Sequence, residues 1–232
     1  MEKSILLHGT DHIIKAPSYT IGNEHNDFGR GFYCKVEPEM AKEWAAAQNT
    51  DGFINRYTFD SEALHTLNLL DGEHSILNWI ALLLKYRTFH LSNEIAIDAR
   101  NYIIDNFSID LSPYDVVIGY RADDSYFSFA EGFVGNGIPL RSLNKALRLG
   151  KLGVQTVLTS EKAFNNLSFM DAQAVDKSTY YPKFVARDSK ARETYRGEVK
   201  TSRSYRDDIF VLDIIREEMK NDDPRIQRIL LD

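Results

Sequence analysis

The stretch NDFGRGFYCKVEPEMAKEWA, residues 26–45, decides how we expect the N-terminal half of this chain to fold. It begins with a glycine-bearing turn, continues as a short aromatic strand, GFYCKV, and ends in an alanine-rich helix that carries Trp44. Pro38 suits the first turn of this helix, and alanine favours helix throughout. The segment therefore supplies backbone freedom followed by two aromatic side chains, a tyrosine and a tryptophan.

Strand patterns recur on both sides of this segment at irregular intervals. Alternating or short apolar runs predict strands at SILLH (4–8), FINRYTF (53–59), YDVVIGY (114–120) and VQTVLTS (154–160). Because no regular strand–helix–strand alternation is present, the pattern predicts an α+β fold. A chain of 232 residues fits one domain, which we expect to cover 1–232.

Helical periodicity dominates two longer regions of the chain. Apolar residues recur at three- and four-residue steps between about 74 and 107, which predicts a helical insertion. Helix and loop patterns then fill about 186–232 as a C-terminal extension. Shorter helices are expected at ADDSYFSFAEGF (122–133, capped by an aspartate), RSLNKALRL (141–149, ending at Gly150) and SEKAFNNL (160–167, with Ser160 as N-cap).

The composition is that of an ordinary globular protein, with 43% hydrophobic and 27% charged residues. A formal net charge of −6 argues against general electrostatic binding to nucleic acid. The stretch 183–206 is nevertheless locally basic, with eight Lys or Arg against three acids. It is either a solvated helix face or a surface suited to RNA or DNA.

Cys34 is the single cysteine, which excludes an internal disulfide and a Cys-based zinc cluster and suits a reducing compartment. The apolar start of the chain is too short for a signal peptide, and the longest apolar run, WIALLL at 79–84, cannot span a bilayer. We therefore expect a cytoplasmic protein with no membrane partner, either retained there or delivered by an export route that reads no N-terminal signal.

The sequence lacks the common catalytic motifs G-x-S-x-G, H-E-x-x-H, the P-loop and a G-x-G-x-x-G that opens a helix after a strand. His8 and His12 are four residues apart, but a turn separates them, so we expect no metal site. Cys34 should point away from the side of its strand that carries Tyr33, into the core.

Two segments, LLHGT (6–10) and FGRGFYCKVEPEMAKEWA (28–45), together resemble the core of the ADP-ribosyltransferases of the His–Tyr–Glu branch, which includes diphtheria toxin and the poly(ADP-ribose) polymerases. In that branch a strand ends in H-G-[ST], an F-G-x-G-x-Y element follows, and an aromatic residue eleven positions past the tyrosine completes the nicotinamide pocket. Here the tyrosine is Tyr33, and eleven positions further on is Trp44. The resemblance implies a split antiparallel β-sheet core with helical insertions, and NAD as co-substrate.

The resemblance also implies how NAD is held. His8 would hydrogen-bond the adenosine-side ribose, with Gly9 and Thr10 completing the strand end. Without a Cβ, Gly9 would let the backbone approach the nicotinamide carboxamide. Tyr33 and Trp44 would take the cationic nicotinamide ring between their faces, since stacking and cation–π attraction each contribute roughly 0.5–2 kcal/mol.

The glycine loop and a later acidic pair supply the remaining candidates. Gly29, Arg30 and Gly31 form the loop, and Arg30 either reaches the ligand's pyrophosphate or faces solvent. Asp123 and Asp124 follow a strand, where a carboxylate could orient or deprotonate an acceptor. They serve equally well as the N-cap and first-turn acids of a helix.

The third element departs from the branch. There a glutamate near the start of a late strand holds the 2′-hydroxyl of the nicotinamide ribose and stabilises the oxocarbenium ion, whereas LGVQTVLTSEKAF has Gln155 at that place. A glutamine still accepts a hydrogen bond but brings no negative charge. The chain resembles most closely a set of bacterial ADP-ribosyltransferase-like domains that pair N-D-F-G-x-G-F-Y with a late-strand glutamine, some of which look like toxins of toxin–antitoxin or phage-defence modules, or injected effectors.

Three function hypotheses follow. The first is an NAD-dependent ADP-ribosyltransferase that modifies a macromolecular acceptor, protein or nucleic acid, with a single ADP-ribose; a cognate antitoxin or immunity protein would then be a further partner. The second is a non-catalytic NAD-binding or interaction module, because the glutamate is missing. The third is an NAD glycohydrolase, which passes ADP-ribose to water.

Overall fold

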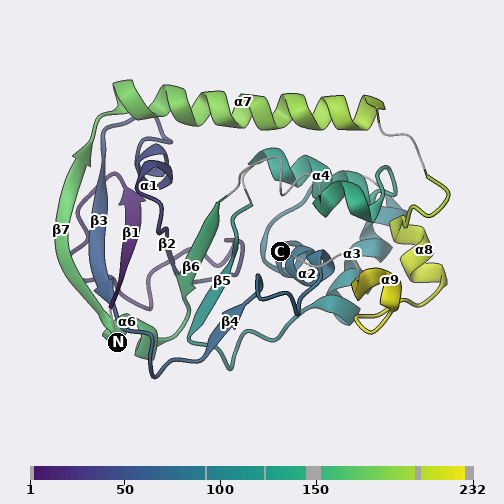
Figure 1. The fold of residues 1–232 in the computed structure, drawn as a ribbon, viewed down its shortest axis with the longest axis horizontal. Helices are drawn as coiled ribbons and strands as arrows, with labels where there is room; N and C mark the ends of the chain where they lie inside the picture. Colours follow the sequence, from purple (N-terminus) through teal and green to yellow (C-terminus); the bar gives the residue numbers. More distant parts are fainter. Residues whose placement is uncertain (1–2, 92, 123, 145–152, 202–204, 228–232) are drawn as a thin grey trace.

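Two β-sheets lie side by side in the computed structural model, which describes residues 3–91, 93–122, 124–144, 153–201 and 205–227 (Figure 1). The first sheet has the order β1-β3-β7 and is antiparallel throughout; its strands are β1 (Ser4–Thr10), β3 (Gly52–Phe59) and β7 (Leu167–Val175). The second has the order β2-β6-β5-β4, with strands β2 (Phe32–Cys34), β4 (Thr66–Asn68), β5 (Val116–Tyr120) and β6 (Val154–Leu158). The α+β class predicted from the sequence is confirmed.

A short bridge joins the two sheets. Leu7 on β1 pairs with Lys35 just after β2, through an N–H···O bond of 2.9 Å in one direction and 2.8 Å in the other. His8 and Tyr33 lie next to the bridge, one on each strand, and these strands belong to different sheets. It therefore fixes the neighbouring ends of β1 and β2 against each other.

Helices cover the second sheet and one end of the first (Figure 1). Every residue of α2 from Ile76 to Leu84 is buried, as expected for a helix that is apolar on all sides. The region 74–107, expected to be helical, contains α2 and α3. The helices are α1 (Pro38–Ala45), α2 (Ile76–Tyr86), α3 (Glu94–Phe107), α4 (Asp124–Val134), α6 (Glu161–Asn165), α7 (Lys177–Thr201), α8 (Val211–Arg216) and α9 (Pro224–Gln227).

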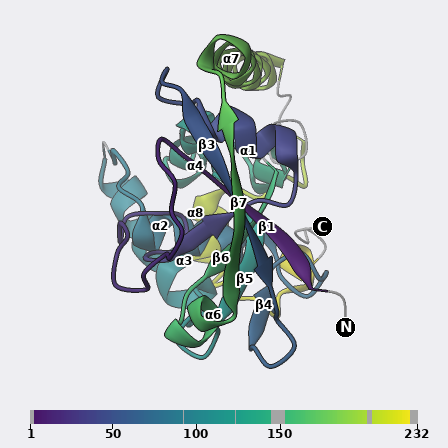
Figure 2. The same cartoon turned by 90° about the vertical axis from the view of Figure 1, so that its left-hand side faces the viewer.

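The long helix α7 runs across the top of the molecule, from the end of β7 past α1 to α4 (Figures 1 and 2). Lys183 and Arg187 on α7 form ion pairs with Glu39 and Glu43 on α1, at 3.2 and 2.7 Å. Part of the basic stretch 183–206 is thus used inside the protein, to attach α7 to α1. Within the described residues, no helix is both long enough and apolar enough to cross a bilayer.

Two strands and one strand direction differ from the expectations drawn from the sequence. The sequence patterns did not predict β4, which has three residues, or β7, an edge strand whose side chains are mostly partly or fully exposed and show no clear alternation. The expected antiparallel core is wrong at one pair: β4 and β5 are parallel, with α2 and α3 in the connection between them. In the helix expected at 141–149, residues 145–149 lie outside the described part of the chain.

Gly9 allows α1 to pack directly on β1. A Cβ at this position would collide with the carbonyl oxygen of Ala41 and lie 2.9 Å from the backbone nitrogen of Ala45, both on α1. The absence of a Cβ at Gly9 thus serves the packing of α1 on β1. Close packing at Gly9 also sets the position of Trp44, which precedes Ala45 on the same helix.

We expect Gly9→Ala to destabilise the protein by about 2–5 kcal/mol, because backbone atoms cannot move aside as a flexible side chain can. Urea denaturation followed by circular dichroism measures this change. The matched control is Gly197→Ala on α7, where a Cβ would meet no atom within 4 Å. That change should stabilise the helix slightly, by up to about 1 kcal/mol. Equal stability of the two variants would contradict the close packing at Gly9.

Candidate functional site

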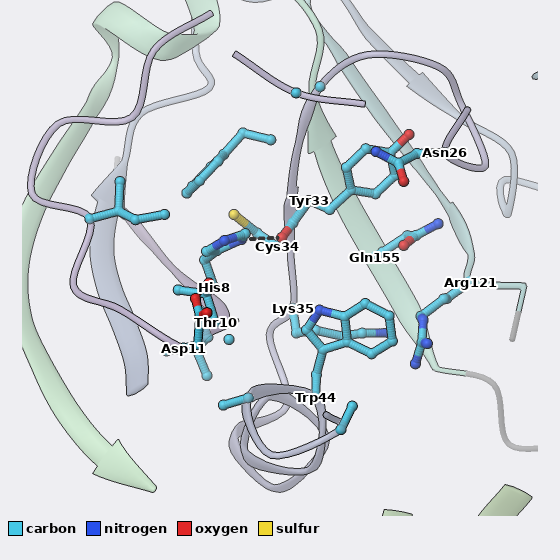
Figure 3. A pocket seen from close by; sticks show the side chains of 18 of the residues that line it. His8, Thr10, Asp11, Asn26, Tyr33, Cys34, Lys35, Trp44, Arg121 and Gln155 are labelled. Carbon is cyan, nitrogen blue, oxygen red and sulfur yellow. Dashed lines mark hydrogen bonds between the residues drawn. The ribbon is translucent and has the colours of Figure 1, made fainter. Parts of the chain in front are cut away.

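A pocket of about 900 Å³ opens where β1, β2, β6 and α1 meet, with the loop 11–31 along its side (Figure 3). Of the site residues predicted from the sequence, those that line it are His8, Gly9, Thr10, Gly31, Tyr33, Trp44 and Gln155. They come from five different elements or loops, which the fold brings together around one space. A volume of this size is at the upper end of the range for small-molecule sites.

His8 is held in one orientation by two contacts. Its Nδ1 donates a hydrogen bond to the carbonyl oxygen of Tyr33 at 2.8 Å, and its ring stacks on Phe32 with centroids 4.3 Å apart. Burial lowers the pKa of His8. The imidazole is thus favoured in its neutral form, with the proton on Nδ1, which leaves Nε2 as a hydrogen-bond acceptor.

Tyr33 places its ring in the pocket wall and its hydroxyl in the glycine turn. The hydroxyl donates to the carbonyl oxygen of Gly29 at 2.7 Å and accepts from the backbone nitrogen of Phe28 at 3.0 Å. Gly29 has φ +75°, a conformation that favours glycine. Burial raises the pKa of Tyr33, so its hydroxyl stays protonated and keeps the turn closed.

Trp44 is 39% exposed, and a cation already lies on its ring. The guanidinium carbon of Arg121 is 3.5 Å from the ring centroid, a cation–π contact (Figure 3). Arg121 follows β5 and was not predicted as a site residue. A ligand ring that stacks on the same face of Trp44 has to displace this guanidinium.

Gln155 is held by a buried carboxylate that the sequence analysis did not single out. Gln155 Nε2 donates to Asp27 Oδ2 at 2.9 Å, and the backbone nitrogen of Ala122 donates to the same oxygen at 2.9 Å. Arg87 Nε lies 3.7 Å from Asp27 Oδ1. Because Nε2 is engaged, the acceptor end of the amide, Oε1, is the end left for a ligand.

Asp27 is only 4% exposed, and burial raises its pKa above the usual value, although Arg87, the Ala122 N–H and the Gln155 amide partly offset this rise. These three partners donate hydrogen bonds or carry positive charge, so the ionised form satisfies all of them. Asp27 belongs to the N-D-F-G stretch that carried the family resemblance. The pairing of Asp27 with Gln155 could not be predicted from the sequence, because the two residues are 128 positions apart.

Lys35 is a second buried charge in the pocket wall. It is two residues past Tyr33, so the two side chains share one face of the strand. The side chain is 6% exposed, and among the residues that the structure describes its Nζ has no hydrogen-bond partner. Burial, and secondly the charge of Arg121, lower the pKa of Lys35 to about 7.

Two predicted site residues of the glycine loop, Gly29 and Arg30, lie outside the pocket. Arg30 is exposed and forms an ion pair with Glu24, and Gly29 packs against Tyr86. Asp123 lies outside the described residues, and for Asp124 the structure describes only its place as the first residue of α4.

Cys34, expected in the core, is buried among hydrophobic residues, and burial raises the pKa of its thiol. Among the described residues no cluster of three or more His, Cys, Asp or Glu side chains could hold a metal ion.

The fold and the site together define an α+β protein with a ligand pocket whose wall carries aromatic rings and buried charges. A family profile described as "Protein of unknown function (DUF3990)" matches residues 4–169. The chain belongs to this family, DUF3990. The matched range contains the pocket residues named above, while Phe184 and Asp188 of α7 line the pocket from beyond it. No curated protein and no solved structure matches the chain.

We expect Lys35→Met to stabilise the protein by roughly 2–4 kcal/mol at pH 6, because methionine fills a similar volume without a buried charge. The pKa of Lys35 falls from its ordinary 10.5 to about 7 on folding. The buried charge therefore destabilises the folded protein fully below pH 7, and this destabilisation disappears as the pH rises toward 10.5.

Urea denaturation at pH 6, 8 and 10 should show a gain for Lys35→Met that shrinks at each step. Lys177→Met, at an exposed position at the start of α7, is the matched control and should change little at any pH. A loss of stability in Lys35→Met that is the same at every pH would mean that packing of the lysine stem outweighs its charge.

Proposed function

We propose that this protein is an NAD-dependent ADP-ribosyltransferase that transfers one ADP-ribose to a macromolecular acceptor. The observation that carries the proposal is the convergence of His8, Tyr33, Trp44 and Gln155 on one pocket (Figure 3). These are the residues through which the sequence resembles the His–Tyr–Glu branch. The arrangement of two adjacent sheets, joined where β1 meets β2, supports the split core that the resemblance implies.

The proposed ligand contacts follow from the geometry. His8 offers Nε2 to a ribose hydroxyl, since its Nδ1 is bonded to the Tyr33 carbonyl. The Tyr33 ring and the indole of Trp44 provide apolar faces for a planar ring. Gln155 offers Oε1 to the 2′-hydroxyl of the nicotinamide ribose, because its Nε2 is bonded to Asp27.

The proposed reaction breaks the bond between C1′ of the ribose and the ring nitrogen of nicotinamide. The bonding electrons go to nicotinamide, which leaves as a neutral molecule, and positive charge builds on C1′ and the ribose ring oxygen. A nucleophile of the acceptor then bonds to C1′ and loses its proton. Negative charge held close to C1′ lowers the barrier, and it acts most strongly where water is excluded.

Asp27 is proposed to supply that charge in place of the glutamate. Its carboxylate lies 2.9 Å from the Gln155 amide and is buried. In the resembled branch, one glutamate both contacts the ribose and carries the negative charge. Here Gln155 would make the contact and Asp27 would carry the charge. The buried carboxylate supports a variant enzyme over an inactive one.

A non-catalytic NAD-binding module is the second candidate. The glutamine in place of the glutamate favours it, because the neutral Gln155 amide brings no negative charge to C1′. NAD would then raise the melting temperature without being consumed.

For the first candidate, we propose a protein acceptor rather than a nucleic acid, because Lys183 and Arg187 of the basic stretch form ion pairs with α1. A role as a toxin, defence component or effector is proposed from the resemblance alone.

The purified protein should release nicotinamide from NAD and label a macromolecule when given labelled NAD and cell lysate. Trp44→Ala should lower kcat/KM for NAD by at least ~10-fold, through loss of one stacking face. Tyr205→Ala is the matched control, because Tyr205 is also an exposed ring under an arginine, Arg141, yet does not line the pocket.

The products decide between the candidates. Free ADP-ribose without labelled macromolecule would indicate a glycohydrolase. Thermal stabilisation by NAD with no nicotinamide release would indicate the binding module. If the wild-type protein neither releases nicotinamide from NAD nor is thermally stabilised by NAD, then NAD is not its ligand.

Asp27→Asn should lower kcat for nicotinamide release by roughly 10–100-fold with little change in KM. The asparagine oxygen can still accept the hydrogen bonds from Gln155 and Ala122, so the variant removes the charge and keeps the geometry.

Gln155→Glu, which restores the residue of the resembled branch, should instead destabilise the protein by roughly 1–3 kcal/mol, because two carboxylates would then be in contact. Nicotinamide release and urea denaturation of both variants measure these effects. Full activity in Asp27→Asn would show that the charge of Asp27 plays no part.

A further inference from the structure

Lys35 is a charged group in the pocket wall that the proposed reaction does not use. Its side chain is more than nine-tenths buried, and its Nζ has no hydrogen-bond partner among the residues that the structure describes. An ammonium group that is removed from water without a partner costs several kcal/mol. A methionine or leucine would fill the same space without that cost, so the choice of lysine points to a counter-charge supplied from outside the chain.

The charges that face Lys35 come from four other segments. Positive charges on Arg121, after β5, and on Arg187, in α7, oppose its protonation, and burial opposes it most. Glu37, before α1, and Asp27, in the glycine loop, favour protonation. Asp27 is already bonded by other partners, as described above, and the Glu37 side chain makes no ion pair with Lys35 within 4.0 Å in the described structure.

Lys35 and Arg121 lie in the same wall of the pocket. Figure 3 shows the Lys35 side chain running beside Trp44 toward Arg121. Arg121 is 9% exposed, and its guanidinium lies on the Trp44 ring. Two cations in adjacent positions, with little water to screen them, attract an anion more strongly than the same groups would on the surface.

We propose that Lys35 and Arg121 bind a phosphate or pyrophosphate group of the ligand that fills this pocket. The identity of that group as the pyrophosphate of NAD rests on the proposed function. Arg30, the residue expected from the sequence to reach the pyrophosphate, is instead exposed and paired with Glu24. The proposal gives this role to two buried side chains that directly follow β2 and β5.

Binding at this site would rearrange the side chains around Lys35. The Nζ of Lys35 has almost no accessible surface, so a phosphate can reach it only when neighbouring side chains shift. Arg121, whose guanidinium lies on the Trp44 ring, is the neighbour that an anion would attract. A guanidinium binds phosphate through paired, charge-assisted hydrogen bonds, which are stronger than its contact with an indole face. The anion would therefore draw Arg121 off Trp44 and clear that ring for the ligand's base.

Binding should also be coupled to protonation of Lys35. With a pKa of about 7, the amine is only partly charged at pH 7.5, and an adjacent anion raises the pKa again. The complex would thus take up a proton as it forms. ADP-ribose is a suitable probe, because its pyrophosphate is a diester that keeps its charge across this pH range.

The experiment is isothermal titration calorimetry of ADP-ribose with the wild-type protein, Lys35→Met and Lys177→Met. Measurements at pH 7.5 in buffers of different ionisation enthalpy give the protons taken up, and measurements at pH 6.5 and 8.5 give the pH dependence. Wild type and Lys177→Met should take up a fraction of a proton and bind more weakly at pH 8.5. Lys35→Met should bind at least ~10-fold more weakly and take up none.

Three outcomes separate this inference from the proposed function. Unchanged affinity and proton uptake in a folded Lys35→Met would overturn the anion site even if NAD is cleaved. Loss of both in Lys35→Met, with inorganic pyrophosphate competing for the wild-type site, would support the anion site even if no nicotinamide is ever released. Absence of binding by wild type to both ADP-ribose and pyrophosphate would overturn the site. Arg121→Gln, a second variant, should weaken ADP-ribose binding and expose Trp44 to fluorescence quenching by iodide.

Discussion

The two hydrogen bonds between Leu7 and Lys35 are the constraint on which the site depends. They form the backbone bridge between β1 and the residue after β2, and His8 and Tyr33 lie next to it on the two strands. The His8 side chain adds a third bond across the same junction, to the Tyr33 carbonyl. If the two strands moved apart, the imidazole would lose its orientation and the pocket would lose its continuous wall. The junction of the two sheets thus determines the shape of the pocket.

Buried charge is the second theme of the pocket. Asp27 is compensated within the chain, by Gln155, Ala122 and Arg87, and this network gives the Gln155 amide a single orientation. Lys35 has no such compensation among the described residues, and its pKa falls as a result. A globular protein of ordinary stability keeps such a group only at a cost. This contrast is the basis for proposing an anion site at Lys35 and a structural role for the Asp27 network.

The sequence predicted the parts of the fold that depend on local pattern. The strands around His8, Tyr33 and Gln155, and the helix that carries Trp44, have clear periodicity, so their meeting in one pocket could be expected from the resemblance. The strand β7 could not, because an edge strand with mostly exposed side chains lacks the alternation of a half-buried one. Asp27, Lys35 and Arg121 were missed for a different reason: the burial of a charged residue and its contacts appear only when segments far apart in the chain are folded together.

The family match ends at residue 169, inside β7, whose pairing with β3 continues to Val175. A recombinant fragment cut at that limit would leave Gly52 to Arg56 of β3 without partners on that edge. It would also lack the helix that supplies Phe184 and Asp188 to the pocket. Unpaired strand edges invite self-association. Insolubility of such a fragment would therefore be a result of the cut at residue 169. Biochemical work on relatives with the same fold should use chains that extend through α7.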